Sequence, residues 1–172
     1  STVLDTFLSY QRAESGNLHA KREQFDLAAL ARRTVDAYSL FSEGRNVRIE
    51  IEGLAEAMVW GDTEFTGEAV ANYLTNAIKF SPNGGLVKLT LQDAEEGVRL
   101  IVSDRGPGVP AGERLRLFQE FSTLSIQPSG GVKSTGLGLY IARRLLEAQQ
   151  GRVGAEFPTN GGSRFWLQLP TT

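Results

Sequence analysis

The stretch from residue 63 to 80 carries polar residues at a spacing that could do chemistry. Glu68, Asn72, Asn76 and Lys79 follow one another at intervals of four, four and three residues, which places them on one face of a helix. Asparagine is a poor residue for a helix interior, so two of them on one face indicate that their amides meet something polar. A carboxamide oxygen is a hard ligand suited to Mg²⁺, and Lys79 adds positive charge. An ordinary solvated face is the alternative to a ligand site.

Two glycine-rich segments could bring the backbone close to a ligand. The first, Asp104-Arg105-Gly106-Pro107-Gly108, follows a predicted strand, and Asp104 can accept a hydrogen bond from an exocyclic amine. The second reads Ser-Thr-Gly-Leu-Gly-Leu over residues 134–139 and opens a predicted helix, whose free N–H groups and dipole favour an anion. Simpler interpretations are an Asx turn and a capped helix start. Neither segment is a Walker A loop or a dinucleotide fingerprint.

Lys133 comes just before the second glycine segment and could reach a phosphate there. A single lysine in a loop is more often simply solvated. The adjacent loop, from Gln119 to Ser134, has about 16 residues without predicted structure, and a loop of that length is typical of a lid or binding loop.

The composition excludes several other chemistries. Without cysteine, disulfides, thiolate metal sites and cysteine nucleophiles are absent, and with His19 as the single histidine there is no multi-histidine metal site. Eighteen basic and 20 acidic residues give a net charge of −2, so no basic excess attracts nucleic acid or acidic lipid. No apolar run approaches the ~18–20 residues of a membrane span, and no signal peptide is visible. The first residue is serine, which leads us to expect a piece of a longer protein.

Hydrophobic periodicity and turn residues predict alternating helices and strands. Helices are expected over 27–41, 63–80, 111–118 and 136–148, with the end of another helix before Gly16-Asn17, and strands over 24–27, 47–52, 57–60, 86–91, 98–103, 152–157 and 163–169. Hairpin turns over 93–97 and 160–162 argue against a purely parallel sheet. The expected fold is α+β: a two-layer sandwich with a mixed, mostly antiparallel sheet covered on one face by about three helices.

Taken together, the motifs resemble the catalytic, ATP-binding domain of sensor histidine kinases, in the superfamily shared with gyrase, Hsp90 and MutL. The resemblance covers about residues 24–170. In chain order its elements are Asn72-x-x-x-Asn76-Ala77-x-Lys79-Phe80, Asp104-x-Gly106-x-Gly108, Phe118-x-x-Phe121, Gly136-Leu137-Gly138-Leu139 and Gly161-Gly162-Ser163-x-Phe165. Their joint order and spacing are specific, although each is weak alone. The family's fold, a mixed sheet covered on one face by three helices, agrees with the predicted elements.

The resemblance implies a role for each matching residue. Asn76 would coordinate Mg²⁺, with Asn72 beside the phosphates and the metal, and Lys79 would contact phosphate. Phe80 occupies a position usually held by tyrosine beside the nucleotide, and Asp104 would accept a hydrogen bond from the adenine amino group. The implied catalytic residues are therefore Asn72, Asn76 and Lys79.

The glycine motifs and the long loop complete the implied site. Gly106 and Gly108 would shape the adenine pocket, residues 119–135 would form a lid over ATP, and Gly136 and Gly138 would present their backbone to the phosphates. Phe118 and Phe121 match a phenylalanine motif that packs the lid and meets the dimerisation helices. The predicted nucleotide-binding residues are Asn72, Asn76, Lys79, Phe80, Asp104, Gly106, Gly108, Lys133, Thr135, Gly136, Leu137 and Gly138.

The chain departs from its relatives at two positions. In the gyrase and Hsp90 branches a glutamate general base stands four residues before the metal-binding asparagine, where this chain has Asn72. Without that carboxylate, activation of water is weakened, which favours a kinase over a free ATPase. Glu68, one turn further away, is an alternative base or a simple surface residue. Histidine kinases often have His-Gly-Gly after the last helix; here Gln149-Gln150-Gly151 keeps the turn, and we expect little consequence.

A histidine kinase phosphorylates its own histidine, usually in H-[ED]-x-x-[TN]-P on an upstream helix. His19 has neither the acidic neighbour nor the proline and follows a helix stop, so it does not fit the acceptor. We interpret residues 1–18 as the end of a dimerisation helix and a linker, and residues 19–172 as the ATP-binding catalytic domain. The expected reaction is transfer of the ATP γ-phosphate to a histidine upstream of this sequence, so the chain alone should bind ATP and phosphorylate nothing.

The expected cofactors and partners follow from the same resemblance. They are ATP, Mg²⁺, the dimerisation helices of the same protein and a response regulator, without nucleic acid or direct membrane contact. We expect a cytoplasmic domain that is monomeric alone and part of a homodimer, membrane-anchored or not, in the whole protein. A serine kinase of the anti-sigma-factor type and a non-catalytic ATP-sensing module are the alternatives. An upstream histidine on a dimerisation helix would distinguish a histidine kinase from the serine kinase. The presence of Asn76, Asp104 and both glycine motifs argues against a degenerate site, such as a sensing module would allow.

Overall fold

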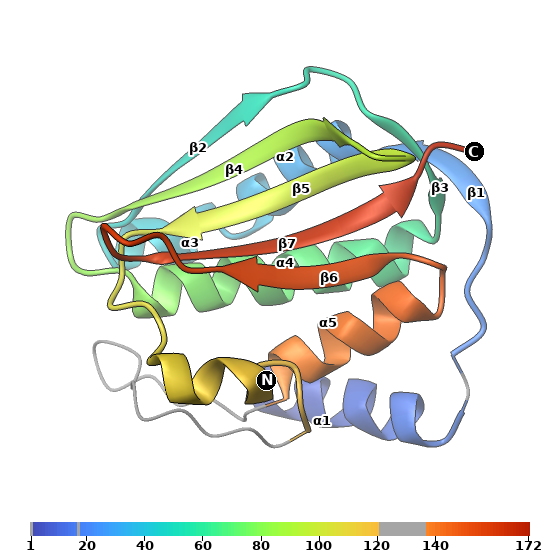
Figure 1. Cartoon of the computed structure of the whole chain (residues 1–172), viewed down its shortest axis with the longest axis horizontal. Helices are drawn as coiled ribbons and strands as arrows, with labels where there is room; N and C mark the ends of the chain where they lie inside the picture. The colour runs from blue at the N-terminus through green and yellow to red at the C-terminus, as the bar shows by residue number, and fades with distance from the viewer. Residues whose placement is uncertain (1, 17, 121–136) are drawn as a thin grey trace.

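A five-stranded sheet forms one layer of the molecule in the computed structural model, which describes residues 2–16, 18–120 and 137–172 (Figure 1). The strand order is β2-β4-β5-β7-β6. Only the β2–β4 pair is parallel among these neighbours, and the remaining pairs are antiparallel. The strands are β2 (Arg48–Gly53), β4 (Leu86–Ala94), β5 (Gly97–Asp104), β6 (Arg152–Glu156) and β7 (Ser163–Pro170). The mixed, mostly antiparallel sheet predicted from the sequence is confirmed.

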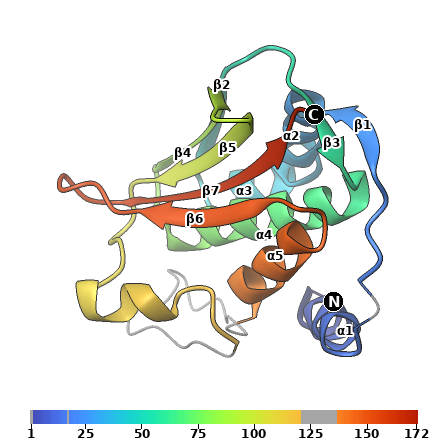
Figure 2. The ribbon, with the colours of Figure 1, turned by 45° about the vertical axis from the view of Figure 1, so that its right-hand side comes forward.

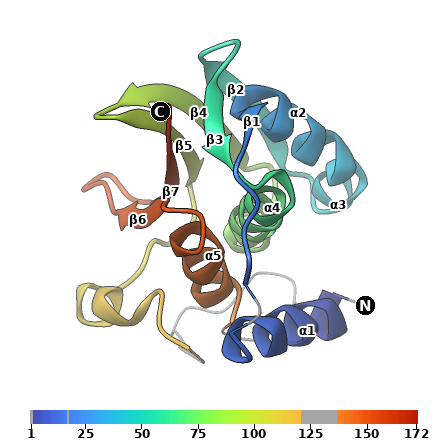
Figure 3. The same cartoon turned by 90° about the vertical axis from the view of Figure 1, so that its right-hand side faces the viewer.

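Three helices cover one face of this sheet: α2 (Leu27–Ala37), α4 (Thr63–Phe80) and α5 (Gly138–Glu147). Seen from the side, they lie together on the same side of the strands (Figure 3). Side chains alternate across a strand, so Val87, Leu89 and Leu91 of β4 are buried under the helices. Lys88 and Thr90, between them, face the other side and are half-buried. The two-layer arrangement agrees with the predicted fold class.

Two of the predicted strands form outside the main sheet, and one predicted helix was wrong in its extent. The strands β1 (Glu23–Asp26) and β3 (Met58–Gly61) pair with each other in a separate antiparallel ribbon (Figure 2). The predicted helix over 27–41 is two helices, α2 and α3 (Ser39–Gly44). The chain leaves helical geometry at Tyr38, with φ −106° and ψ 14°, and its ring packs against the core. Tertiary packing thus overrides a continuous helical pattern at this residue.

Two further helices lie near the predicted ranges. The predicted helix at 111–118 is a 3₁₀ helix, η1 (Ala111–Arg116). Helix α1 (Thr2–Glu14) ends just before Gly16, whose φ is +75°, and packs against α5 (Figure 1). None of the helices in the described part of the chain is long and apolar enough to cross a membrane.

The start of α4 is tied to the end of α5 by one buried side chain to which sequence analysis assigned no role. The Gln149 carbonyl oxygen Oε1 accepts hydrogen bonds from the Asp62 backbone N–H at 2.7 Å and from the Thr66 hydroxyl at 3.1 Å. Its Nε2 donates to the carbonyl of Leu145 at 3.2 Å. Asp62 also caps α4, accepting from the Phe65 N–H at 3.0 Å. Gln149 therefore fixes α5 against the first turn of α4.

We predict that Gln149→Ala lowers the free energy of unfolding by about 2–3 kcal/mol, because it leaves the buried donors of Asp62 and Thr66 without an acceptor. Urea denaturation measures this change. The control is Gln92→Ala, which removes the same side chain at an exposed position of β4 and should change stability by no more than about 0.5 kcal/mol. Equal effects of the two substitutions would contradict the assignment.

Candidate functional site

The polar face of α4 lies against the beginning of α5. Asn72 Nδ2 donates a hydrogen bond to the backbone carbonyl of Gly138 at 3.2 Å, across 66 residues of sequence. A Cβ atom added to Gly138 would lie 3.9 Å from Asn76 Nδ2 and 4.0 Å from Asn72 Cγ. Both asparagines are half-buried. The structure therefore brings both asparagines next to the second glycine segment.

The C-terminal end of α4 meets the loop after β5. Asp104 ends β5, is only 9% exposed, and accepts a hydrogen bond from the Gly106 N–H at 2.8 Å. A Cβ on Gly106 would lie 2.6 Å from the carbonyl oxygen of Phe80, closer than real Cβ atoms approach. Glycine is therefore required for this loop to lie against the last turn of α4, and Asp104, Gly106 and Phe80 converge.

Burial dominates the electrostatics of Asp104. Desolvation raises the pKa of its carboxyl from 3.8 to about 6, although hydrogen bonds from the backbone of Gly106 and Ser163 act in the opposite direction. Ser163 is the residue paired with Asp104 in the β5–β7 register. A carboxyl in a buried corner with a pKa raised by desolvation is a candidate for a functional site.

A third glycine closes this corner, although sequence analysis gave the Gly161-Gly162 pair no role beyond a hairpin turn. Gly162 has φ +84°, and a Cβ there would lie 2.2 Å from the carbonyl oxygen of Asp104. Gly108 in turn lies against Gly162, since a Cβ on Gly108 would be 3.2 Å from the Gly162 carbonyl oxygen. The turn before β7 thus packs directly on the loop that carries Asp104.

Lys79 lies in the last turn of α4 and is half-buried. Burial, and then the positive charge of Arg45, lower the pKa of its ammonium group. Arg45 reaches the same turn, with Nη2 donating to the carbonyl oxygen of Lys79 at 3.1 Å. A desolvated cation beside a second cation favours the approach of an anion.

Several predicted residues are placed elsewhere or not described. Lys133, Thr135, Gly136 and Phe121 lie outside the described residues, as does nearly all of the predicted lid over 119–135. Leu137 is buried and joins the cluster around Phe65 and Ile141. Phe118 packs edge-on against Phe165, with ring centroids 6.3 Å apart, so the first member of the phenylalanine motif is attached to the core.

Glu68 is held by helix α1. It accepts a hydrogen bond from the Ser9 hydroxyl and forms an ion pair with Arg12 at 3.2 Å. The Arg12 guanidinium also lies over the ring of Phe65, 5.5 Å from its centroid. His19, between α1 and β1, is exposed and outside any helix. The carboxylate of Glu68 is therefore occupied by α1, which fits a surface residue better than a base.

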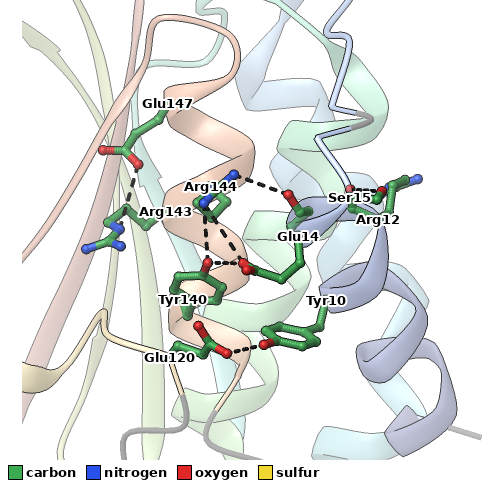
Figure 4. A network of polar contacts seen from close by, with 10 residues as sticks. Tyr10, Arg12, Glu14, Ser15, Glu120, Tyr140, Arg143, Arg144 and Glu147 are labelled. Atoms are coloured by element: carbon green, nitrogen blue, oxygen red, sulfur yellow. Dashed lines mark hydrogen bonds and ion pairs between the residues drawn. The ribbon is translucent and has the colours of Figure 1, made fainter.

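A polar network joins α1 to α5 and was missed by sequence analysis (Figure 4). The Tyr140 hydroxyl donates to Glu14, and Arg144 donates to the Tyr140 oxygen at 3.3 Å and lies 4.0 Å from Glu14. The Tyr10 hydroxyl donates to Glu120, and this bond, with burial, raises the pKa of Tyr10 to about 12. Glu14 and Tyr140 are 126 residues apart, so no local pattern could have paired them.

Comparison with known proteins places the chain in a family. The model of the family described as histidine kinase-, DNA gyrase B-, and HSP90-like ATPase matches residues 61–172. The match covers more than half of the chain, which therefore belongs to this family of ATPases and kinases. The five-stranded sheet and its helices are the fold of histidine kinase catalytic domains.

The relatives within that family are sensor kinases. The sensor protein IrlS of Burkholderia pseudomallei is 29% identical over 170 residues, which are 99% of this chain and 36% of that protein. The mycobacterial sensor histidine kinase MprB superposes with a TM-score of 0.77 at 27% identity, over 86% of this chain and 97% of that one. Full-length ShkA, solved in complex with AMPPNP, gives 0.82 at 25% identity, over 99% of this chain and 36% of that one. The chain thus spans about a third of the length of IrlS and ShkA.

The raised pKa of Asp104 predicts a specific pH dependence of stability. Its carboxyl binds a proton more readily in the folded than in the unfolded chain, so its contribution to stability is fully present below about pH 4 and is lost as the pH rises through 6. Asp104→Asn removes this dependence. The stability of the variant relative to wild type should therefore increase by about 2.5 kcal/mol between pH 4 and pH 7.

Urea denaturation of the ligand-free proteins at several pH values measures this difference. Asp93→Asn makes the same chemical change at the exposed end of β4 and is the matched control. A stability difference for Asp104→Asn that does not change with pH would show that the carboxyl is not desolvated in the folded chain.

Proposed function

We propose that the chain binds Mg²⁺-ATP between α4, the loop after β5 and the start of α5, and that it transfers the γ-phosphate to a histidine of the same protein. The observation that carries this proposal is that the C-terminal half of α4 meets both glycine segments: Asn72, in the middle of the helix, contacts Gly138, and the Phe80 carbonyl, at its end, lies against the Asp104–Gly106 turn. Membership of the ATPase family supports ATP as the substrate.

The buried corner at Asp104 suits the adenine ring. A nucleobase amino group would donate to the Asp104 carboxylate in a site where little water competes, and this donor would restore the ionised form that burial disfavours. Gly106 and Gly108 let the loop lie close against the backbone of Phe80 and Gly162, which sets the shape of this corner. Phe80, half-buried at the end of α4, would lie beside the nucleotide.

The phosphates would then extend along α4 toward the beginning of α5. Lys79 supplies positive charge, and the backbone at Gly138 approaches the two asparagines. Gly136, Thr135 and Lys133 complete this part of the proposal from outside the described residues. Helix starts present unpaired N–H groups to an anion, which would orient the triphosphate.

The side chains present fit Mg²⁺. Within the described part of the chain no cluster of three or more histidine, cysteine, aspartate or glutamate residues could hold a metal alone. Mg²⁺ commonly binds through one or two protein oxygens together with substrate phosphates, and the carboxamide oxygen of Asn76 would be one such ligand, with Asn72 nearby. When bound, the ion would neutralise charge on the triphosphate.

The reaction proposed is an in-line displacement. A histidine nitrogen forms a bond to the γ-phosphorus as the bond to the ADP oxygen breaks. Histidine is already a nucleophile, so α4 and the glycine segments need only position the triphosphate and stabilise its charge. The engagement of Glu68 by α1 occupies the carboxylate one turn before Asn72 and does not leave it free to activate water, which favours transfer to histidine over hydrolysis.

The acceptor would belong to a segment upstream of this sequence. Residues 1–18 are proposed to be the end of a dimerisation helix and its linker, with residues 19–172 the catalytic domain. Leu4, Phe7 and Leu8 of α1 are 55%, 48% and 57% exposed and share one side of the helix, as expected for the end of a helical bundle. A homodimer through these helices and phosphotransfer to a response regulator are proposed for the whole protein, with a cytoplasmic catalytic domain.

We predict that Asn76→Ala abolishes the gain in ATP affinity that Mg²⁺ gives to wild type, because the carboxamide ligand is lost. Isothermal titration calorimetry with and without Mg²⁺ measures this effect. Asn83→Ala, an exposed asparagine after α4, is the control and should keep the Mg²⁺ effect. An Asn76→Ala protein that still gains affinity from Mg²⁺ would assign the ligand elsewhere.

A longer form of the chain, extended by its native upstream segment, should incorporate label from γ-labelled ATP. The phosphoryl group should be acid-labile and alkali-stable, as phosphohistidine is. Acid-stable label would instead assign a serine kinase, and tight ATP binding without any label would assign an ATP-sensing module. The Asn76→Ala variant of the same protein controls for label that does not depend on the site.

A further inference from the structure

Arg45 follows directly after α3 and is held in a fixed place beside the end of α4. Asn46 Nδ2 donates to Asn83 Oδ1 at 2.8 Å, and the Asn46 carbonyl accepts from the Gly84 N–H at 2.8 Å. Both contacts tie the turn after α3 to the turn after α4. The backbone of Arg45 is therefore fixed next to the last residues of α4.

The side chain of Arg45 uses this position to reach Lys79. Its Nη2 donates to the Lys79 carbonyl oxygen at 3.1 Å, one of the carbonyls that a helix end leaves without an intrahelical partner. Both side chains are half-buried. The fold thus holds a guanidinium group on the backbone of Lys79, close enough for its charge to act on the ammonium group of the same residue, and water screens their repulsion only in part.

We propose that Arg45 is a positioning residue for the nucleotide: it fixes the last turn of α4 and keeps a second positive charge beside Lys79, so that this end of the helix favours a polyphosphate. This inference rests on the proposed function. Arg45 acts through Lys79 rather than by contact with the reacting atoms.

The like charges of Arg45 and Lys79 should affect the measured affinity for charged ligands. Among the described charged side chains, the one that shifts the pKa of Lys79 is that of Arg45, which lowers it together with burial. A bound triphosphate would offset the repulsion, so the contribution of Arg45 should grow with the negative charge of the ligand. Affinity for ATP should depend on Arg45 most, and affinity for uncharged adenosine should hardly depend on it.

A purely structural role for Arg45 predicts something different. A cation at the C-terminal end of a helix stabilises the helix through its carbonyls and dipole. In that case removal of the guanidinium would lower the stability of the fold and weaken all ligands alike. The charge of the ligand and the pH would then make no difference.

The experiment compares Arg45→Gln and Arg45→Lys with wild type by calorimetric titration of ATP and adenosine between pH 7.5 and 10. The phosphates of ATP are fully ionised over this range. Arg48→Gln is the matched control, because Arg48 is an exposed arginine of β2 paired with Glu50 at 3.5 Å. Lys79→Met identifies the contribution of the ammonium group, and urea denaturation of each variant accounts for changes in stability.

We expect Arg45→Gln to weaken ATP about three- to tenfold at pH 7.5 and to leave adenosine within about twofold. Wild type should lose ATP affinity at alkaline pH, when Lys79 is deprotonated. This loss should move to higher pH in Arg45→Gln, because the repulsion that lowers the pKa of Lys79 is removed, and it should vanish in Lys79→Met. Arg45→Lys, which retains the charge, should keep most of the ATP affinity and the wild-type pH profile. Arg48→Gln should resemble wild type.

Equal weakening of ATP and adenosine by Arg45→Gln, or an unshifted alkaline profile, would overturn the proposal and leave Arg45 as a helix cap. Failure of the proposed function is distinguishable, because wild type would then bind no ATP at any pH.

Discussion

The site depends on the rotation of α4 about its own axis, and one buried hydroxyl fixes that rotation. Tyr73 is fully buried, and its hydroxyl donates to the Trp166 carbonyl of β7 at 3.0 Å. Burial raises the pKa of this phenol well above its ordinary value, so the hydroxyl keeps its proton and remains a donor. Because Asn72 and Asn76 flank Tyr73 on the helix, a hydrogen bond that sets the direction of Tyr73 also sets theirs.

The apolar face of α4 supplies the energy that holds this arrangement. Leu74 and Ile78 are fully buried with Tyr73, and each large side chain removed from water contributes about 1.5–3 kcal/mol. That burial offsets unfavourable features on the polar side: the desolvated Asp104 carboxyl and the neighbouring charges of Lys79 and Arg45. A bound nucleotide would relieve both features. Its amino group would donate a hydrogen bond to Asp104, and its phosphates would bring negative charge to Lys79 and Arg45.

Helix α1 links the two helices of the site, because it contacts both α4 and α5. It reaches α4 through Arg12 and Glu68 and α5 through Glu14 and Tyr140. The ring centroids of Tyr10 and Tyr140 lie 6.1 Å apart, and Tyr10 also bonds Glu120. A displacement of α1 would therefore be felt by both α4 and α5, the two helices beside the proposed phosphate region.

The sequence by itself determined what depends on neighbours along the chain. The spacing of Asn72, Asn76 and Lys79 specified a polar helix face, and alternating side chains and turn residues specified the strands, because both patterns follow from backbone geometry over a few residues. The order of the motifs was enough for the family and the fold class. Their assignment to ATP and Mg²⁺ stays a prediction for each residue.

Only the tertiary structure decided which of these local features meet. The contact of Asn72 with Gly138, the packing of Gly162 on Asp104, and the links made by Gln149 each join residues far apart in sequence. The break at Tyr38 and the separate β1–β3 ribbon likewise arise from packing. Such contacts depend on how whole elements bury their apolar faces against one another, and no short sequence window contains that information.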